Sequence, residues 1–151
     1  MSGEEQSKQK LVLDGHKLAW HRDRLEAWLA GERIAPITID CALTRRCTYN
    51  CVYCYSKLQY HDSKRMTREV LYRFLDDAAE IGVKAISFVS DGESTCSPFL
   101  EDALIRGKSN GLDMALGTNG YLLKLKRLEE TLPSLTYLRF NFSAGEPEAY
   151  A

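Results

Sequence analysis

The chain has 151 residues, of which 44% are hydrophobic and 27% charged, values that are ordinary for one globular domain with a single hydrophobic core. A formal net charge of −1 gives no overall basic field of the kind that binds nucleic acid. The longest apolar runs are too short to span a bilayer, and the polar start MSGEEQSKQK lacks the apolar core of a secretory signal. We therefore expect a cytoplasmic protein that binds neither nucleic acid nor membrane.

The first 33 residues are expected to form a separate extension. Residues 1–10 are polar and are predicted to be a tail. Apolar residues then recur at helical spacing over residues 16–30, and Gly31 can end that helix. We place the domain boundary after this helix, with residues 1–33 as tail and extension helix and residues 34–151 as the core domain.

Strand and helix signals alternate through the core domain. Strands are predicted over residues 34–44, 85–90, 114–118 and 135–143. Helices are predicted over residues 70–81, 97–109 and 122–132, with Thr67 as the cap of the first, Ser97-Pro98 as the start of the second and Pro133 as the end of the third. This βαβαβαβ order with short connections predicts an α/β fold with a parallel sheet and right-handed crossovers.

Two of the predicted strands carry polar residues along one face. In the last strand, Arg139, Asn141 and Ser143 lie opposite Leu138, Phe140 and Phe142. In the first, Thr38, Asp40 and Thr44 lie opposite Ile37, Ile39 and Leu43. A parallel strand buried on both faces is usually apolar throughout, so this pattern favours a barrel with a wet lumen that holds a ligand. The unusual loops all follow strands, at the end where α/β barrels carry their active sites.

The most informative segment is CTYNCVYCY, residues 47–55, directly after the first predicted strand. The chain has five cysteines, and an odd number in a reducing compartment argues against a disulfide framework. Cys47, Cys51 and Cys54 are spaced C-x3-C-x2-C, which lets three thiolates wrap one metal centre. A structural zinc site would need a fourth ligand, and the nearby Cys41 lies inside the predicted strand. Three thiolates on an iron–sulfur cluster leave one metal open to a small molecule.

This cysteine motif, with Tyr53 before its last cysteine and a strand before its first, resembles the radical SAM superfamily. The resemblance implies a partial parallel (β/α)6 barrel, of which the sequence covers about four βα units at the N-terminal side. It implies that Cys47, Cys51 and Cys54 hold a 4Fe–4S cluster and that S-adenosylmethionine chelates the open iron. It also places Tyr53 near the adenine. The implied activity is reductive cleavage of S-adenosylmethionine to a 5′-deoxyadenosyl radical, which abstracts a hydrogen atom from the substrate.

Other strand ends carry further cofactor-binding candidates. Asp91-Gly92-Glu93 resembles the family's Gly-Gly-Glu motif for the methionyl amino group, with Asp91 where the first glycine is usual; an ordinary turn is the alternative. Thr118-Asn119 resembles a common ending of the third strand, although a simple turn would look the same. Three polar residues of the last strand match the region that contacts ribose and carboxylate, and a guanidinium suits the carboxylate: Arg139, Asn141 and Ser143.

The two remaining cysteines have weaker signals. Cys96 lies just beyond the Glu93 loop and is a candidate hydrogen-atom donor to a substrate radical; the alternative is a small buried or helix-capping cysteine. Cys41 is expected in the core.

The substrate is expected to be a small molecule or a peptide, with peptide or sugar modification, such as epimerisation, as the reaction. The resemblance also implies an external electron donor of the flavodoxin or ferredoxin type. The alternative function is a non-catalytic iron–sulfur electron-transfer or zinc-binding module.

Overall fold

A computed structural model describes residues 17–58 and 64–146 of the chain. The backbone divides into two compact units, Met1–Ile34 and Ala35–Ala151. Within the described part of the first unit, a short 3-10 helix η1 (Lys17–Trp20) is followed by α1 (Arg22–Leu29). The single helix expected here is therefore interrupted at His21, whose φ of −128° is not helical, while Gly31 ends the segment with a φ of 84° as predicted. The predicted tail lies outside the described residues.

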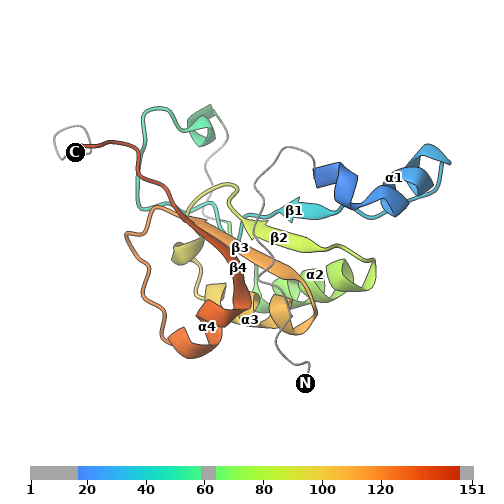
Figure 1. Ribbon diagram of the computed structural model, residues 1–151. Coiled ribbons are helices and arrows are strands. Elements are labelled where there is room, and N and C mark those ends of the chain that lie inside the picture. Colours follow the sequence, from blue (N-terminus) through green and yellow to red (C-terminus); the bar gives the residue numbers. More distant parts are fainter. Residues whose placement is uncertain (1–16, 59–63, 147–151) are drawn as a thin grey trace, which may run out of the picture. The chain divides into compact units, whose positions relative to one another are not determined.

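The second unit contains one sheet of four parallel strands in the order β1-β2-β3-β4 (Figure 1). The strands are β1 (Thr38–Asp40), β2 (Ala85–Phe88), β3 (Asp113–Thr118) and β4 (Leu135–Phe140). The helices between them are α2 (Arg68–Glu80), α3 (Leu100–Ser109) and α4 (Leu128–Ser134), with 3-10 turns η2 (Tyr55–Leu58) and η3 (Ser94–Cys96). The sheet is open in the described residues, with β1 and β4 at its edges, so the fold is the partial α/β barrel that the sequence predicts. No helix of the described chain is long and apolar enough to cross a membrane.

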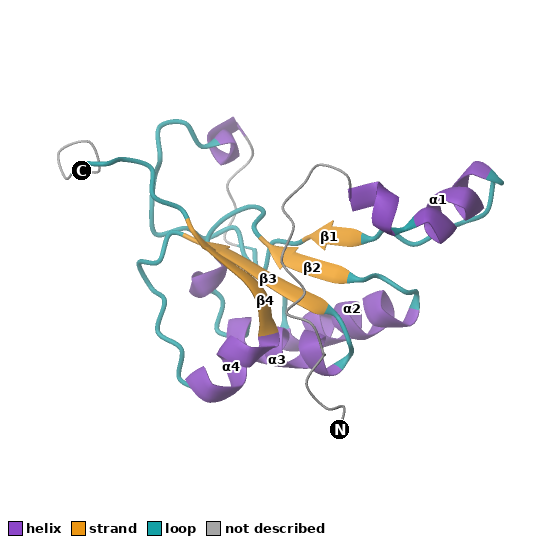
Figure 2. Ribbon diagram, in the orientation of Figure 1, coloured by secondary structure: helices purple, strands orange, loops and turns teal. Residues whose placement is uncertain are grey.

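The helices α2, α3 and α4 lie on one side of the sheet, and α2 and α3 form the hydrophobic core with it (Figure 2). Alternate residues of the central strands are buried against them, such as Ile86, Phe88, Met114 and Leu116. The intervening residues face the other side and are half-buried, apart from the exposed Asp113 at the start of β3. The alternation arises because each strand sends successive side chains to opposite faces. The polar residues expected on the lumen face belong to the edge strands, where Thr38, Asp40 and Arg139 are exposed. In contrast, β2 and β3 present mostly small residues on that side, such as Ala115 and Gly117.

The strand β1 is shorter than predicted, but its faces agree with the expectation. Thr38 and Asp40 are exposed, whereas Cys41 is buried in the core. Thr44 is predicted on the same polar side and is instead buried, because the chain has left the sheet there and pairs Thr44 with Arg65 in an antiparallel β-bridge.

The helix α2 begins as predicted, since the Thr67 hydroxyl accepts a hydrogen bond from the Val70 N–H. The start predicted for α3 is wrong. Residues of η3 precede it, and the Ser97 hydroxyl accepts a hydrogen bond from the Phe99 N–H, so the helix begins at Leu100.

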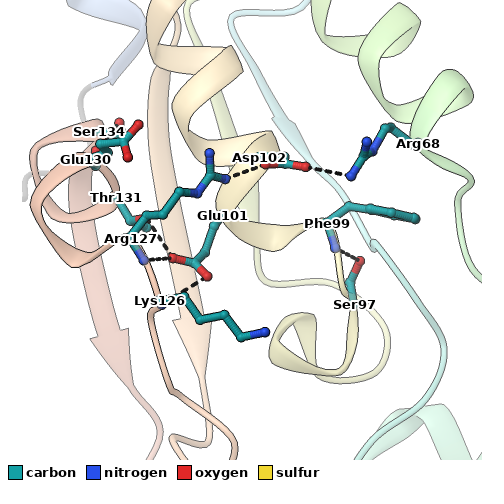
Figure 3. A network of polar contacts seen from close by, with 10 residues as sticks. All are labelled: Arg68, Ser97, Phe99, Glu101, Asp102, Lys126, Arg127, Glu130, Thr131 and Ser134. Carbon is teal, nitrogen blue, oxygen red and sulfur yellow. Dashed lines mark hydrogen bonds and ion pairs between the residues drawn. The ribbon is translucent and has the colours of Figure 1, made fainter.

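The helix predicted over residues 122–132 is also displaced, and α4 contains Pro133 in its last turn. A carboxylate of α3 explains the displacement (Figure 3). Glu101 Oε1 accepts from the Lys126 N–H at 3.1 Å, and Oε2 accepts from the Arg127 N–H at 2.8 Å and the Thr131 hydroxyl at 3.1 Å. Glu101 thus satisfies N–H groups at the start of α4 that no helical carbonyl can reach. Sequence periodicity cannot report such a distant cap.

Two arginines and a second acidic residue surround this cap (Figure 3). Asp102 pairs with Arg127 and, at 3.3 Å, with Arg68. Burial acts to raise the pKa of Glu101, but the N–H donors of Arg127 and Lys126 outweigh it and hold that pKa below its usual value. The carboxylate therefore stabilises the fold above its unfolded-state pKa, and this stabilisation is lost as the pH falls through the folded pKa.

Replacing Glu101 by Ala should lower the free energy of unfolding by about 1 kcal/mol, the typical cost of losing a helix cap. Urea denaturation followed by circular dichroism measures this. Glu129→Ala is the matched control, because Glu129 is exposed in the first turn of α4. The deficit of the Glu101 variant should shrink on acidification through the carboxyl range. Equal stability of the two variants at neutral pH would contradict the capping role.

Candidate functional site

The three clustered cysteines line one pocket, of about 350 Å³, where the chain leaves β1 and β2. Its wall also includes Tyr49 and Tyr55 from the cysteine loop. The opposite wall is the turn after β2, with Asp91 and Gly92. The predicted neighbourhood of the cysteine and Asp-Gly-Glu loops is therefore present in the structure.

Local hydrogen bonds shape the cysteine loop, here defined as residues 47–55. The Tyr49 N–H donates to Cys47 Sγ at 3.4 Å. The Cys54 N–H donates to the Cys51 carbonyl at 3.1 Å, and Cys54 opens the turn that becomes η2. Cys54 Sγ lies 2.9 Å from the Ser56 hydroxyl. No role is predicted from the sequence for Tyr49 or Ser56. For Ser56 the sequence does hold one signal: its hydroxyl follows Cys54 by two residues, close enough in the chain to contact that sulfur.

The donor set of the pocket suits an iron–sulfur cluster. All three thiols are free, and thiolates are the usual ligands of such clusters. Within the described residues no three His, Cys, Asp or Glu side chains are gathered closely enough to hold a single metal ion. Partial desolvation of the sulfur raises the pKa of Cys47, and the Glu93 carboxylate adds to this, while the Tyr49 N–H opposes it. Ligation at Cys47 must therefore displace a proton.

The turn after β2 fits tightly against the backbone that leads into the cysteine loop. Gly92 has a φ of 68°, which favours glycine. A Cβ atom there would lie 2.3 Å from the Thr44 carbonyl oxygen and 2.7 Å from that of Arg46. The Glu93 N–H also donates to the Arg46 carbonyl at 2.8 Å. Only glycine allows these two loops to approach so closely.

Glu93 is buried, with 4% of its surface exposed, and its carboxylate accepts four hydrogen bonds. Oε1 accepts from the Thr95 N–H at 3.0 Å, the Thr95 hydroxyl at 2.8 Å and the Thr118 hydroxyl at 2.7 Å. Oε2 accepts from the Asn119 N–H at 2.8 Å. The carboxylate therefore joins the turn after β2 to the end of β3, and Oε2 keeps capacity for a further donor.

The end of β4 supplies three of the predicted cofactor-binding residues. Arg139 is exposed on the lumen face beside Gly117 and has no ion-pair partner among the described residues. The Asn141 N–H donates to the Thr118 carbonyl at 2.8 Å, and its side-chain amide donates to the Ser143 hydroxyl at 3.0 Å. The Tyr53 hydroxyl also hydrogen-bonds to Ser143, so the structure brings the cysteine loop and the end of β4 together.

The other two cysteines differ in environment. Cys96 is half-buried at the end of η3, and its N–H donates to the Glu93 carbonyl at 2.9 Å. Burial raises the pKa of its thiol. Cys41 is 7% exposed, and burial raises its pKa to about 11. The core position predicted for Cys41 is confirmed.

Residues 42–151 match the family model of the Radical SAM superfamily. The chain belongs to this superfamily. It is 30% identical over 118 residues to the GTP 3',8-cyclase of Campylobacter fetus subsp. fetus, covering 68% of this chain and 36% of that protein. It is 30% identical over 113 residues to the PqqA peptide cyclase of Bradyrhizobium diazoefficiens, covering 74% and 30%. The chain thus spans about a third of the length of these curated relatives.

Solved structures share the fold. BtrN in complex with AdoMet and 2-DOIA is 17% identical, with a TM-score of 0.59 over 78% of this chain and 51% of that one. Streptococcus suis SuiB bound to S-adenosylmethionine is 24% identical, with a TM-score of 0.59 over 80% of this chain and 28% of that one. The cofactors of the superfamily are the two expected from the sequence, a 4Fe–4S cluster and S-adenosylmethionine.

Replacing Gly92 by Ala should displace the cysteine loop, because the new Cβ would collide with two backbone carbonyls. Gly111→Ala is the matched control, since Gly111 has a φ of 82° and nothing within 4 Å of its Cβ position. Both variants should lose about 1–2 kcal/mol of stability from the left-handed backbone. Only Gly92→Ala should also lose most of its iron after anaerobic reconstitution, measured as iron per chain. Equal iron content would contradict the close fit.

Alkylation of the reduced, cluster-free protein should separate the cysteines. At mildly alkaline pH, iodoacetamide should modify Cys47, Cys51 and Cys54 well before Cys41, which is buried and has a pKa of about 11. Peptide mass spectrometry over time measures the order, and urea should abolish the difference. Early modification of Cys41 in the folded protein would show that the core placement is wrong.

Proposed function

We propose that the protein acts as a radical S-adenosylmethionine enzyme, with the core domain, residues 34–151, as its cofactor-binding part. The observation that carries this proposal is the convergence of Cys47, Cys51 and Cys54 in one pocket against the turn of Asp91 and Gly92. These thiolates would hold the cluster. When bound, the cluster supplies the electron that cleaves S-adenosylmethionine to methionine and a 5′-deoxyadenosyl radical, which takes a hydrogen atom from the substrate.

The pocket and the neighbouring strand ends together offer a complementary group for each part of S-adenosylmethionine. The guanidinium of Arg139 would pair with the methionyl carboxylate, since it is exposed and has no ion-pair partner in the described chain. The methionyl amino group would donate hydrogen bonds to the turn of Asp91 and Gly92. Glu93 Oε2, which accepts one hydrogen bond in the structure, could accept another from it. Tyr53 would lie beside the adenine.

Four further residues complete the proposed site. Asn141 and Ser143 would contact the ribose from the end of β4. Thr118 and Asn119 have side chains already bonded to Glu93 and Thr48, so we assign them to supporting that face of the site.

The proposed substrate is a small molecule or a peptide. Support comes from the similarity to the PqqA peptide cyclase and from a further structure of SuiB, bound to precursor peptide SuiA, with a TM-score of 0.61. Peptide or sugar modification, epimerisation included, is the proposed reaction class. In an epimerisation, the Cys96 S–H would give a hydrogen atom to the substrate radical and become a thiyl radical; its raised pKa keeps the thiol protonated.

The proposed reductant is an external flavodoxin- or ferredoxin-type protein, and the proposed location is the cytoplasm. This donor would supply the low-potential electron that reduces the cluster, as the resemblance to the superfamily implies. A cytoplasmic site would keep the loop thiols reduced for cluster assembly.

Anaerobic reconstitution with iron and sulfide tests the proposal. The protein should turn brown, and its electron paramagnetic resonance spectrum after reduction should change on addition of S-adenosylmethionine. Replacing any one of Cys47, Cys51 or Cys54 by Ala should remove the cluster, whereas Cys41→Ala, the control, should retain it. Formation of 5′-deoxyadenosine by the reduced protein would establish the activity.

Two outcomes would instead support the alternative functions. A stable cluster whose spectrum ignores S-adenosylmethionine would identify an electron-transfer module. A colourless protein that binds zinc and keeps its metal on exposure to air would identify a zinc-binding module.

A further inference from the structure

Asn119, the first residue after β3, reaches the cysteine loop with its side chain. Its amide nitrogen Nδ2 donates to the Thr48 hydroxyl at 3.0 Å and lies 4.0 Å from Cys47 Sγ, the outer limit for a hydrogen bond to sulfur. Thr48 directly follows Cys47 in the chain. Asn119 therefore holds the first residue after the first cysteine of the motif.

The orientation of the Asn119 amide follows from its other contact. Its Oδ1 accepts the Tyr121 N–H at 3.0 Å. An N–H can only donate, so the oxygen must face Tyr121 and the NH2 group must face the cysteine loop. The NH2 group carries two hydrogens, and one of them serves Thr48. The second is available to the sulfur.

The backbone of Asn119 is itself fixed. Its N–H donates to Oε2 of the buried Glu93 at 2.8 Å, while the Glu93 N–H donates to the Arg46 carbonyl just before the cysteine loop. The loop is therefore held from both sides of Cys47, by Arg46 before it and Thr48 after it. Both attachments lead back to the same buried residue, Glu93, one through its carboxylate and the other through its backbone N–H.

We propose that Asn119 is a positioning residue for the iron–sulfur cluster, which holds Cys47 in place through Thr48 and directs an N–H towards its sulfur. This rests on the proposed function, because it assumes that Cys47 binds the cluster. Partners of this kind orient a metal ligand, and their loss typically weakens metal retention by 10–100-fold. A donor aimed at a thiolate also stabilises the more negative, reduced cluster and so raises its reduction potential.

Four variants test this proposal. Asn119→Ala removes both donors, Thr48→Val removes only the acceptor in between, and Asn119→Asp keeps an acceptor for the Thr48 hydroxyl but loses the donor to sulfur and adds negative charge. Asn110→Ala is the matched control, because the Asn110 amide donates to Asp76 on α2 at 2.7 Å, away from the pocket. Circular dichroism melts correct each result for any change in global stability.

The first readout is the reconstituted cluster. Iron retention against a chelator should fall about tenfold in Asn119→Ala and further in Asn119→Asp, with little change in Asn110→Ala. The reduction potential should become more negative in both Asn119 variants. Combining Asn119→Ala with Thr48→Val in a double variant should give non-additive effects, because both substitutions break the same Asn119–Thr48 hydrogen bond. Wild-type retention and potential in Asn119→Ala, with weakened binding of S-adenosylmethionine, would overturn the proposal and make Asn119 a cosubstrate ligand.

The second readout needs no cluster and therefore separates this inference from the proposed function. In the cluster-free protein, amide hydrogen exchange across residues 47–55 should quicken in Asn119→Ala and Thr48→Val and stay unchanged in Asn110→Ala. Should the wild-type chain bind no cluster, the proposed function fails, yet quicker exchange would still establish that Asn119 positions the loop. Unchanged exchange in Asn119→Ala would overturn the positioning role in either case.

Discussion

The buried carboxylate of Glu93 is the constraint on which the site depends. A buried charge is tolerated only when it is paired or fully hydrogen-bonded, and here the four donors come from Thr95, Thr118 and Asn119. Each donor must therefore lie within hydrogen-bond distance of one point between β2 and β3. The Glu93 N–H extends this requirement to the Arg46 carbonyl and so to the cysteine loop. The hydrogen bonds of this one residue therefore set the relative positions of three segments: the turn after β2, the end of β3 and the start of the cysteine loop.

The layers beneath the site make this arrangement rigid. Parallel strands bring their carboxyl ends to one edge of the sheet, and the buried faces of β2 and β3 are packed against α2 and α3. These helices are joined by Arg106, which binds both carboxylate oxygens of Asp76, at 2.9 and 2.6 Å, and stacks over Tyr72. Such bidentate pairs add geometric specificity as well as energy. Binding loops can then vary while the scaffold stays the same.

Local signals were enough to predict most of the scaffold. The Thr67 cap and the apolar stripe after it place α2 correctly, and the order of elements gives the parallel sheet. Predictions were wrong where a distant partner decides the structure. The start of α4 depends on Glu101 in the preceding helix, and Thr44 is covered by segments that come later in the chain, through its β-bridge to Arg65 and the approach of Gly92 to its carbonyl. Neither partner is visible as a periodicity in the segment that it controls.

The same distinction holds within the site. The spacing of the three cysteines indicates the kind of metal centre, because ligand number and type are local properties of nine residues. The placement of those thiols is not local. Cys47 is approached by the amide of Asn119, and Tyr53 meets Ser143, across 72 and 90 residues of chain respectively. A cysteine motif alone therefore specifies ligation, whereas the environment of the thiolates is set by strand ends that come from later in the fold. That environment governs the reduction potential of iron–sulfur centres, so chains with the same motif can differ in chemistry through residues outside it.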